Sequence, residues 1–201
     1  MDWNKRINLI SRKGEDSIIE KHFLDSVLFL PEMGNLCTGV LSAKGRPASG
    51  GQYARTILDI GSGGGFPAIP LAIMKPEWKF TLCESIKKKV DFLIHLVKEL
   101  NLENVQIVND RVRACRGMPQ QGNKYDIVTA RAVAKLDELI KYALPLLQKD
   151  GHLIAYKAKD IDDEIENAKK IIDKNNLKLE IFSKEVNGVK RKLVLTSNKI
   201  N

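Results

Sequence analysis

The feature that most constrains the fold is a regular alternation of strand and helix patterns that begins at residue 56. Short apolar segments typical of buried strands lie at 56–60, 79–84, 104–109, 124–130 and 152–157. Segments with the apolar spacing of helices lie at 66–75, 87–101, 135–151 and 160–176. The last two expected helices, 135–151 and 160–176, flank the fifth strand. We expect Gly151 to end the helix over 135–151.

Two more strand patterns, 178–186 and 191–197, follow and are joined by a short turn at Asn187 and Gly188. Strands that alternate with helices predict right-handed βαβ units and a mostly parallel sheet. The sequence therefore predicts an α/β fold with a mostly parallel seven-stranded sheet. The terminal hairpin places an antiparallel strand at or near the end of that sheet.

The chain before residue 56 has a different pattern. Residues 16–30, DSIIEKHFLDSVLFL, carry apolar residues at helical spacing and predict a helix with one apolar face that ends at Pro31. Residues 34–55 contain five glycines and Pro47, which predicts a long flexible loop. We expect an N-terminal helical segment over 1–33, a loop over 34–55 and one domain over 56–201.

Composition limits the possible environments and partners. The formal net charge is +8, which is expected either of a protein that binds a polyanion such as nucleic acid or of a lysine-rich surface. The three cysteines, Cys37, Cys83 and Cys115, lack metal-ligand spacing, so we expect neither disulfides nor a metal. No apolar run could span a bilayer and no apolar signal region opens the chain, so we expect a cytoplasmic protein with no membrane partner.

The first strand–helix turn, in ILDIGSGGGFPAIPLA over 57–72, holds four glycines within five residues. Ligands of doubly wound sheets bind beyond the carboxyl ends of the strands, and the first such turn is the favoured place. Glycine permits positive φ and lets a ligand approach the backbone closely. We therefore expect a nucleotide-type site at residues 61–65.

The pattern alone leaves two cofactors open. A dinucleotide fingerprint fails from Gly61, because Phe66 stands in the sixth position, but passes from Gly63 with Glu84 at about the expected distance. Asp59, at the strand end, would repel a pyrophosphate and attract a cation. S-adenosylmethionine carries an ammonium and a sulfonium and no phosphate, so the charge of Asp59 favours S-adenosylmethionine over NAD.

Two further strand ends are candidates for contact with such a cofactor. Glu84 ends the second strand, where an acid can accept hydrogen bonds from both ribose hydroxyls, or can simply be solvated. Residues 109–114, NDRVRA, follow the third strand, where contacts to adenine are usual, or form a plain polar loop.

Several motifs together resemble one family. WNKRINLIS, HFLDSV, LDIGSGGGFPAIPLAI, ESIKKKVDFL, VTARAVAKL and AYKAK run in order across residues 3–159. With them the chain resembles the bacterial GidB (RsmG) methyltransferases, which methylate N7 of a guanine in 16S ribosomal RNA with S-adenosylmethionine. The resemblance implies a Rossmann-like class I methyltransferase fold with added N-terminal helices. It also implies 16S ribosomal RNA as the partner, free or within the 30S subunit, and we expect a monomer.

The resemblance also assigns site residues. It implies cofactor contacts at Gly61, Phe66, Val112, Arg113 and Arg131. It implies an RNA-facing role for HFLDS, which includes His22 and Asp25, and for the basic surface.

Three departures from the family pattern bear on these implications. Arg113 stands where the family commonly has Glu, which weakens binding if the contact is through the carboxylate and spares it if the contact is through the main chain. The chain begins at WNKRINL, without the family's usual leading helical segment, and we expect this to reduce RNA binding or stability. The loop over 34–55 is longer than usual, with no role that we can assign.

The expected reaction needs no general base, because N7 of guanine attacks with a free lone pair. Positioning then carries catalysis, and Arg131 is the best candidate, since a guanidinium can hold the cofactor carboxylate, the guanine O6 or a phosphate. Lys157 ends a strand and is expected either to reach RNA phosphate or to be solvated. His22 and Asp25 either line the RNA site or tie their helix to the sheet.

Basic surface residues are candidates for phosphate contact: Lys5, Arg6, Arg12, Lys13, Lys87, Lys88 and Lys89. Two alternatives to an RNA methyltransferase stay open. One is a small-molecule methyltransferase or NAD-dependent reductase on a similar fold. The other is an RNA-binding module without activity.

Overall fold

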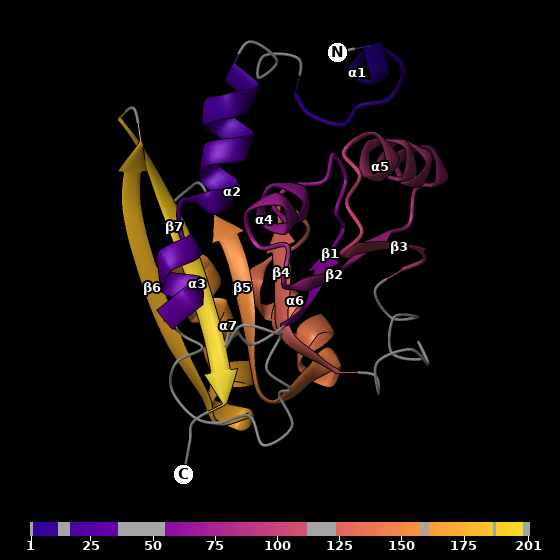
Figure 1. The fold of residues 1–201 in the computed structure, drawn as a ribbon. Coiled ribbons are helices and arrows are strands. Elements are labelled where there is room, and N and C mark those ends of the chain that lie inside the picture. Colours follow the sequence, from indigo (N-terminus) through magenta and orange to yellow (C-terminus); the bar gives the residue numbers. More distant parts are fainter. Residues whose placement is uncertain are drawn as a thin grey trace.

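The computed structural model describes residues 2–11, 17–35, 55–111, 124–157, 161–186 and 188–198. Within these residues seven strands form one sheet in the order β3-β2-β1-β4-β5-β7-β6 (Figure 1). The strands are β1 (Thr56–Ile60), β2 (Lys79–Glu84), β3 (Val105–Asn109), β4 (Tyr125–Arg131), β5 (Leu147–Lys157), β6 (Leu177–Val186) and β7 (Val189–Asn198). β7 pairs antiparallel with both β5 and β6, and the other neighbours pair parallel. The expectation of a mostly parallel sheet with an antiparallel strand near its end is confirmed.

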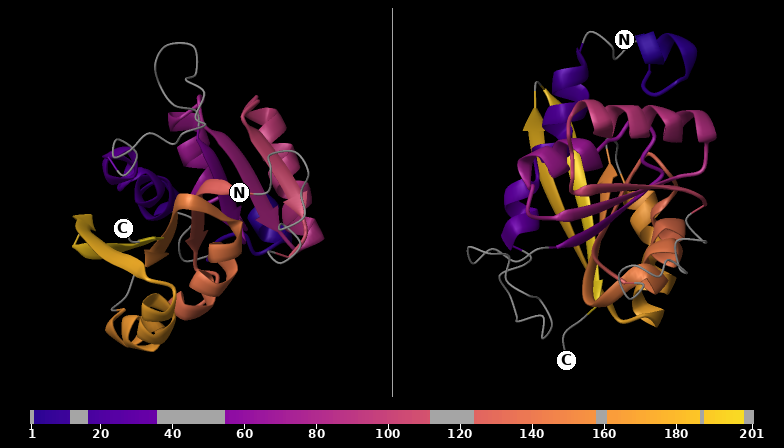
Figure 2. Two further views of the ribbon diagram at one scale, coloured as in Figure 1. Left: turned by 90° about the horizontal axis from the view of Figure 1, so that it is seen from below. Right: turned by 45° about the vertical axis from the view of Figure 1, so that its right-hand side comes forward.

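Helices cover both faces of the sheet (Figure 2). One face carries α4 (Ala68–Met74), α5 (Lys87–Glu99) and the N-terminal helices η2 (Ile19–Leu24), α2 (Asp25–Val27) and α3 (Leu30–Asn35). The other face carries α6 (Leu136–Ala143) and α7 (Asp162–Lys174). A short helix, α1 (Asp2–Arg6), lies beside α5, and a 3-10 turn, η5 (Leu144–Leu146), follows α6. Among the described helices none combines the length and apolar character needed to cross a membrane.

Side-chain parity in the central strands separates two cores. Ile57, Ile127 and Ile154 pack with Phe29 and Met33 on the face covered by α3, α4 and α5. A directly neighbouring residue in each strand, Leu58, Val128 or Leu153, faces the other way and belongs to the core formed with α6 and α7.

The same parity sorts the polar residues at the carboxyl ends of the strands. It places Asp59, Glu84, Thr129 and Arg131 on the α4 face, two or four residues after apolar residues of that core. Lys157 follows Tyr156, which pairs with Arg131, so it lies on the opposite face, toward α6 and α7. The acids of the glycine turn and Arg131 therefore share one face, and Lys157 does not.

The predicted helix over 135–151 is wrong in its second half. α6 ends at Ala143, and the chain enters β5 at Leu147. Pro145 explains the early end, because proline lacks the amide hydrogen that an α-helix needs and clashes with the preceding turn. Gly151 lies inside β5 rather than at a helix end. A Cβ there would lie 2.9 Å from the carbonyl oxygen of Tyr125.

The prediction of one helix with one apolar face over 16–30 is also wrong. Residues 19–24 form a π-helical turn, and a new helix, α3, starts at Leu30 and continues through Pro31 to Asn35. A π-helix has more residues per turn than an α-helix, so the spacing no longer points every apolar side chain inward. Ile19 is 62% exposed, while Phe29 is 1% exposed.

Of the loop predicted over 34–55, residues 36–54 lie outside the described residues, and 34–35 belong to α3. The described part of the N-terminal segment packs on the same sheet as the rest of the chain, through Phe29 and Met33. The division at 1–33, 34–55 and 56–201 stays a prediction.

Candidate functional site

The glycine turn after β1 needs positive backbone angles. Gly61, Gly63 and Gly65 have φ of +66°, +53° and +87°. The left-handed conformation costs other residues about 1–2 kcal/mol, so the sequence GSGGG is what allows this turn to form. The amide of Gly61 donates to the carbonyl oxygen of Cys83 at 2.8 Å, which fixes the turn to the end of β2.

Asp59 lies directly before this turn and is almost fully buried, at 1% exposure. Its Oδ1 accepts a hydrogen bond of 2.7 Å from Thr129 Oγ1 on β4. Its Oδ2 is the one buried side-chain oxygen or nitrogen in the described residues without a hydrogen-bond partner. Burial raises the pKa of Asp59 from 3.8 to about 6. The site therefore holds a half-satisfied carboxylate that a bound cation would stabilise.

Glu84, at the end of β2, braces the glycine turn. Its Oε2 accepts from the amide of Gly63 at 2.9 Å, and its Oε1 accepts from the amide of Ile86 at 2.9 Å. Each carboxylate oxygen can accept a second hydrogen bond, so Glu84 keeps capacity for ligand hydroxyls. The structure thus brings three of the predicted cofactor residues, Asp59, Gly63 and Glu84, together at one edge of the sheet.

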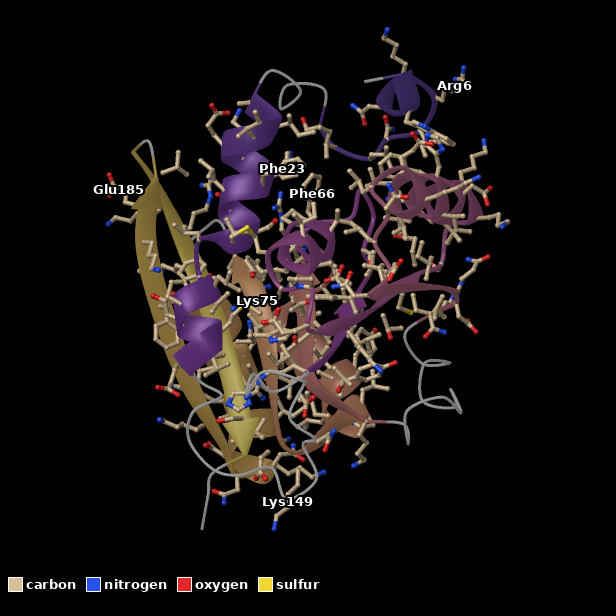
Figure 3. The ribbon with its side chains drawn as sticks, viewed as in Figure 1. Arg6, Phe23, Phe66, Lys75, Lys149 and Glu185 are labelled. Atoms are coloured by element: carbon tan, nitrogen blue, oxygen red, sulfur yellow. The ribbon has the colours of Figure 1, made fainter. Side chains whose placement is uncertain are left out.

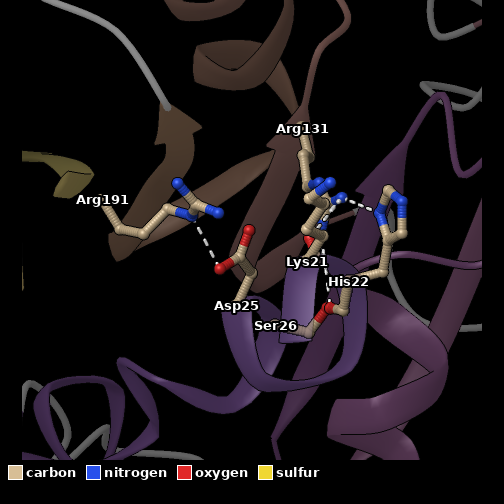
Figure 4. Close-up of polar contacts among 6 residues, drawn as sticks. All are labelled: Lys21, His22, Asp25, Ser26, Arg131 and Arg191. Atoms are coloured by element: carbon tan, nitrogen blue, oxygen red, sulfur yellow. Dashed lines mark hydrogen bonds and ion pairs between the residues drawn. The ribbon is translucent and has the colours of Figure 1, made fainter. Parts of the chain in front are cut away.

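Arg131, at the end of β4, reaches across to the N-terminal helices (Figure 4). Its two terminal nitrogens donate to the carbonyl oxygens of His22, at 3.4 Å, and Lys21, at 3.3 Å. One of them also contacts Nδ1 of the His22 imidazole. Arg131 and His22, 109 residues apart in the chain, thus form one cluster.

Aromatic side chains extend this cluster to the glycine turn. The rings of His22 and Phe66 stack, with centroids 5.1 Å apart and planes 29° apart. Phe23 meets Phe66 edge-on at 5.2 Å, and the two project toward each other beside α4 (Figure 3). The Arg131 guanidinium lies 5.7 Å from the centroid of Phe66. Phe66 is therefore the contact point between the turn and the N-terminal helices.

Asp25 lies between Arg131 and Arg191 and pairs with Arg191 of β7, Oδ1 to Nε, at 2.7 Å (Figure 4). Both side chains are largely buried. Nearby, the Tyr156 hydroxyl donates to the carbonyl oxygen of Ser26 at 2.9 Å. This geometry matches the alternative in which Asp25 ties its helix to the sheet.

Lys157 is also held within the protein. Its Nζ lies 2.6 Å from Oε2 of Glu164 and donates to the carbonyl oxygen of Ala134 at 3.1 Å. The same Glu164 oxygen accepts from the amide of Leu136, the first residue of α6. Lys157 thus joins β5 to the starts of α6 and α7, on the face opposite Arg131.

Sequence reasoning missed two parts of the site. One is Thr129, whose position could be inferred from strand parity, because it stands two residues before Arg131. The other is the cover formed by residues 2–11. Trp3 packs on Phe92 of α5, and a Cβ at Gly64 would lie 3.4 Å from the carbonyl oxygen of Leu9. No periodicity in WNKRINLI indicates this long-range contact.

Two predicted cofactor residues, Val112 and Arg113, lie outside the described residues, as do Arg12 and Lys13. The described residues before them run to Arg111 and include Asn109, whose side-chain amide donates to the carbonyl oxygen of Glu84 at 3.1 Å. In the ranges that the structure covers, no three His, Cys, Asp or Glu side chains could together hold a metal ion.

The residues present fit a ligand with an ammonium group and no diphosphate. The bare glycine turn allows close approach, and Asp59 offers an unpartnered buried oxygen beside it. A diphosphate would place two negative charges against that oxygen, whereas an ammonium would supply its missing hydrogen bond.

Comparison with known proteins also points to a methyltransferase. The family model for GidB, described as rRNA small subunit methyltransferase G, matches residues 1–194. A ribosomal RNA small subunit methyltransferase G of Roseiflexus sp. (strain RS-1) is 38% identical over 172 residues, covering 86% of this chain and 66% of that protein. The protein of the same description from Roseiflexus castenholzii is 41% identical over 167 residues, covering 83% and 64%. The chain thus spans just under two thirds of the length of these relatives.

Solved structures support the fold. A SAM-dependent methyltransferase from Aquifex aeolicus superposes with a TM-score of 0.61 at 16% identity, covering 98% of this chain and 99% of that one. A human methyltransferase 10 domain containing protein gives a TM-score of 0.66 at 13% identity, covering 88% and 83%. The predicted class I methyltransferase fold is confirmed. Because the family model matches residues 1–194, nearly the whole of this chain, the chain belongs to the GidB family, rRNA small subunit methyltransferase G.

Proposed function

We propose that this chain transfers a methyl group from S-adenosylmethionine to N7 of a guanine in 16S ribosomal RNA. The observation that carries the proposal is the unpartnered oxygen of Asp59 beside the bare glycine turn, in a chain of the GidB family. The unpartnered oxygen favours a cationic methyl donor, and membership of the family points to ribosomal RNA as the substrate.

The chain's own residues have distinct tasks in holding the donor. Asp59 binds its ammonium, and the backbone at Gly61 and Gly63 lies against it without a side chain between. Glu84 accepts from its ribose hydroxyls with the lone pairs that Gly63 and Ile86 leave free. Phe66 and Arg131 line the side toward the substrate, and the resemblance adds Val112 and Arg113.

The bound donor supplies a methyl group activated by a sulfonium. N7 of guanine has its lone pair free, so no side chain has to remove a proton first. The work of the chain is to orient the reacting atoms and to exclude water. Residues 2–11 and the rings of His22 and Phe23 cover the glycine turn from two sides, which suits that role.

Calorimetric titration tests the cofactor. We expect S-adenosylmethionine to bind and NADH not to bind, since the diphosphate of NADH would meet Asp59. Tight NADH binding with no response to S-adenosylmethionine would support the reductase alternative and reject the proposal.

Transfer of labelled methyl groups tests the substrate. We expect incorporation into unmethylated 16S ribosomal RNA, free or within 30S subunits, with 7-methylguanosine as the modified nucleoside. RNA binding without incorporation would support the alternative of an inactive binding module. Incorporation into small molecules and none into RNA would support the other alternative.

We also propose that the chain acts as a monomer, because residues of one chain suffice to join the glycine turn, Asp59, Glu84 and Arg131 into one site. Light scattering of the purified protein, alone and with S-adenosylmethionine, should give the mass of one chain in both states.

A further inference from the structure

The contact between Arg131 and His22 determines which ring nitrogen of the histidine carries the proton. A guanidinium has only donors, so Nδ1 of His22, which Arg131 contacts, must accept. An imidazole with an accepting Nδ1 is neutral and carries its single proton on Nε2. The cluster therefore presents one N–H donor, at the end of the ring that points away from Arg131 (Figure 4).

The cluster holds this tautomer firmly. Arg131 also donates to the carbonyl oxygens of Lys21 and His22, so it fixes the backbone of the π-helical turn as well as the ring. Burial, with the charge of Arg131, lowers the pKa of His22 from 6.5 to about 4, so the ring stays neutral near pH 7. In the part of the chain that the structure covers, no hydrogen bond engages Nε2.

The donor also lies beside the glycine turn. His22 stacks on Phe66, the residue that directly follows the glycine turn. A base that accepts from Nε2 in the plane of the imidazole is close to parallel with the Phe66 ring, since the two ring planes differ by 29°. Such a base would lie beside the glycine turn that holds the methyl donor in the proposed function.

We propose that Nε2–H of His22 donates to O6 of the target guanine and so selects guanine over adenine, a role that rests on the proposed function. Guanine shows two acceptors, N7 and O6, on this edge, whereas adenine shows a donor amine in place of O6. N7 must keep its lone pair free to form the new bond to carbon, while the electrons of the broken S–C bond stay on sulfur. A single donor aimed at O6 meets both demands.

The neutral state of His22 matters for the same step. The positive charge passes from the sulfonium to the guanine ring during transfer, and no proton is released. A cationic imidazolium at O6 would oppose that charge, whereas a neutral imidazole does not. Arg131 contributes as a positioning residue, because it fixes the tautomer and the ring of His22.

The test combines variants of His22 with analogues of the base. The methylated guanosine is first mapped in wild-type product, and 16S RNA is then prepared with inosine or 2-aminopurine at that position. Inosine keeps O6 and N7, and 2-aminopurine keeps N7 but lacks O6. His22→Phe keeps a stacking ring without the donor, and His22→Gln keeps a donor.

Wild-type protein should methylate inosine like guanine and 2-aminopurine about 10- to 100-fold more slowly in kcat/KM. His22→Phe should lose about 10- to 100-fold on guanine and no longer distinguish 2-aminopurine, with affinity for S-adenosylmethionine unchanged. His22→Gln should recover part of the difference. His152→Gln serves as the matched control and should behave as wild type, because His152 pairs with Ile127, four residues before Arg131, and so lies away from the strand ends that carry the site.

The outcomes separate the two proposals. Wild-type protein that forms no 7-methylguanosine in any RNA overturns the proposed function. Wild-type protein that forms it, but that methylates 2-aminopurine as fast as guanine or keeps full activity as His22→Phe, overturns the role of His22 alone. A folded His22→Gln variant keeps the test decisive if His22→Phe does not fold.

Discussion

If Asp59 binds the ammonium of the donor as proposed, donor binding should depend on pH, because only the ionised carboxylate attracts a cation. The pKa of Asp59 in the free protein is raised to about 6 by burial. Thr129, Ser62 and Arg131 oppose that rise in the pKa, and Glu84 adds to it. We predict that affinity for S-adenosylmethionine, measured by calorimetry, increases from pH 5 to pH 7 as Asp59 ionises. His22 does not contribute in this window, because its pKa is about 4.

The same residue acts on stability with the opposite sign. The folded pKa of about 6 lies above the ordinary 3.8, so the contribution of Asp59 to stability is present at low pH and is lost as the pH rises through 6. The difference corresponds to roughly 3 kcal/mol of unfolding free energy. In Asp59→Asn both pH dependences should disappear between pH 4 and 7. An unchanged pH dependence of donor affinity in that variant would contradict the assignment.

Gly63 allows a comparison between strain and function. In Gly63→Ala the backbone stays in the left-handed region, at φ of +53°, which costs about 1–2 kcal/mol of unfolding free energy. Its Cβ would meet only the carbonyl oxygen of Gly61, at 3.8 Å, so the methyl group would occupy the space proposed for the donor. We predict a clear loss of donor affinity by calorimetry.

Gly188→Ala is the matched control for this variant. Gly188 has φ of +72° in the β6–β7 turn, and a Cβ there would meet no heavy atom within 4 Å. Denaturant unfolding should show a similar loss of stability in both variants, with donor affinity lost only at Gly63. Equal donor affinity in the two variants would mean that the turn does not contact the donor.

At the scale of elements, the ion pair of Asp25 and Arg191 fixes the N-terminal helices to β7. Both side chains are 12–14% exposed and share a hydrogen bond of 2.7 Å. A double-mutant cycle with Asp25→Asn and Arg191→Gln should give a coupling of about 1.5–3 kcal/mol, since a charged hydrogen bond out of water is worth that much. Urea unfolding of the four proteins measures it.

The pair of Lys87 and Asp91, one turn apart on α5 and 69% and 48% exposed, is the control for that cycle. Its coupling should be only about 0.3–0.5 kcal/mol, because water screens it. Equal couplings for the two pairs would show that this ion pair does not help to hold the N-terminal helices on β7.

How far the sequence predicts these elements depends on whether their signal is local. The strands at 56–60 and 79–84 match β1 and β2 residue for residue, since a buried apolar run between turns has a short-range pattern. The helix over 135–151 was predicted too long because its apolar spacing continues past Pro145 into η5 and the start of β5. The π-helical turn at 19–24 has no local signal, since its side chains are placed by contacts with Phe66 and Arg131.

The same distinction applies to the site. Asp59, Gly63 and Glu84 could be grouped from the sequence because the ends of parallel strands meet at one edge. The partners of His22 and Lys157 could not, because each depends on which face of the sheet a helix covers. Arg131 and Lys157 end adjacent strands, yet parity turns them to opposite faces, and only the registered pairing of Arg131 with Tyr156 reveals it.

Over the whole molecule, the lysines that contribute to the net charge of +8 lie on more than one face. Lys87, Lys88 and Lys89 begin α5, directly after the end of β2 that carries Glu84, so they border the candidate site. Lys169, Lys170 and Lys174 lie in the second half of α7, on the face that Arg131 does not share. RNA bound at the site should therefore meet the first set and not the second.

Salt dependence distinguishes these sets. Binding of 16S RNA should weaken steeply with salt, because each phosphate contact releases a counterion. Replacing Lys87, Lys88 and Lys89 by Gln lowers the net charge from +8 to +5, since three positive charges are removed. It should reduce the slope of log affinity against log salt by about 2.

The same replacements at Lys169, Lys170 and Lys174 also give +5 and should leave the slope unchanged, because those side chains do not face the RNA. Filter binding between low and moderate salt measures both slopes. Equal reductions in the two triple variants would mean that RNA responds to total charge and not to a defined face. The basic composition would then carry no information on where RNA binds.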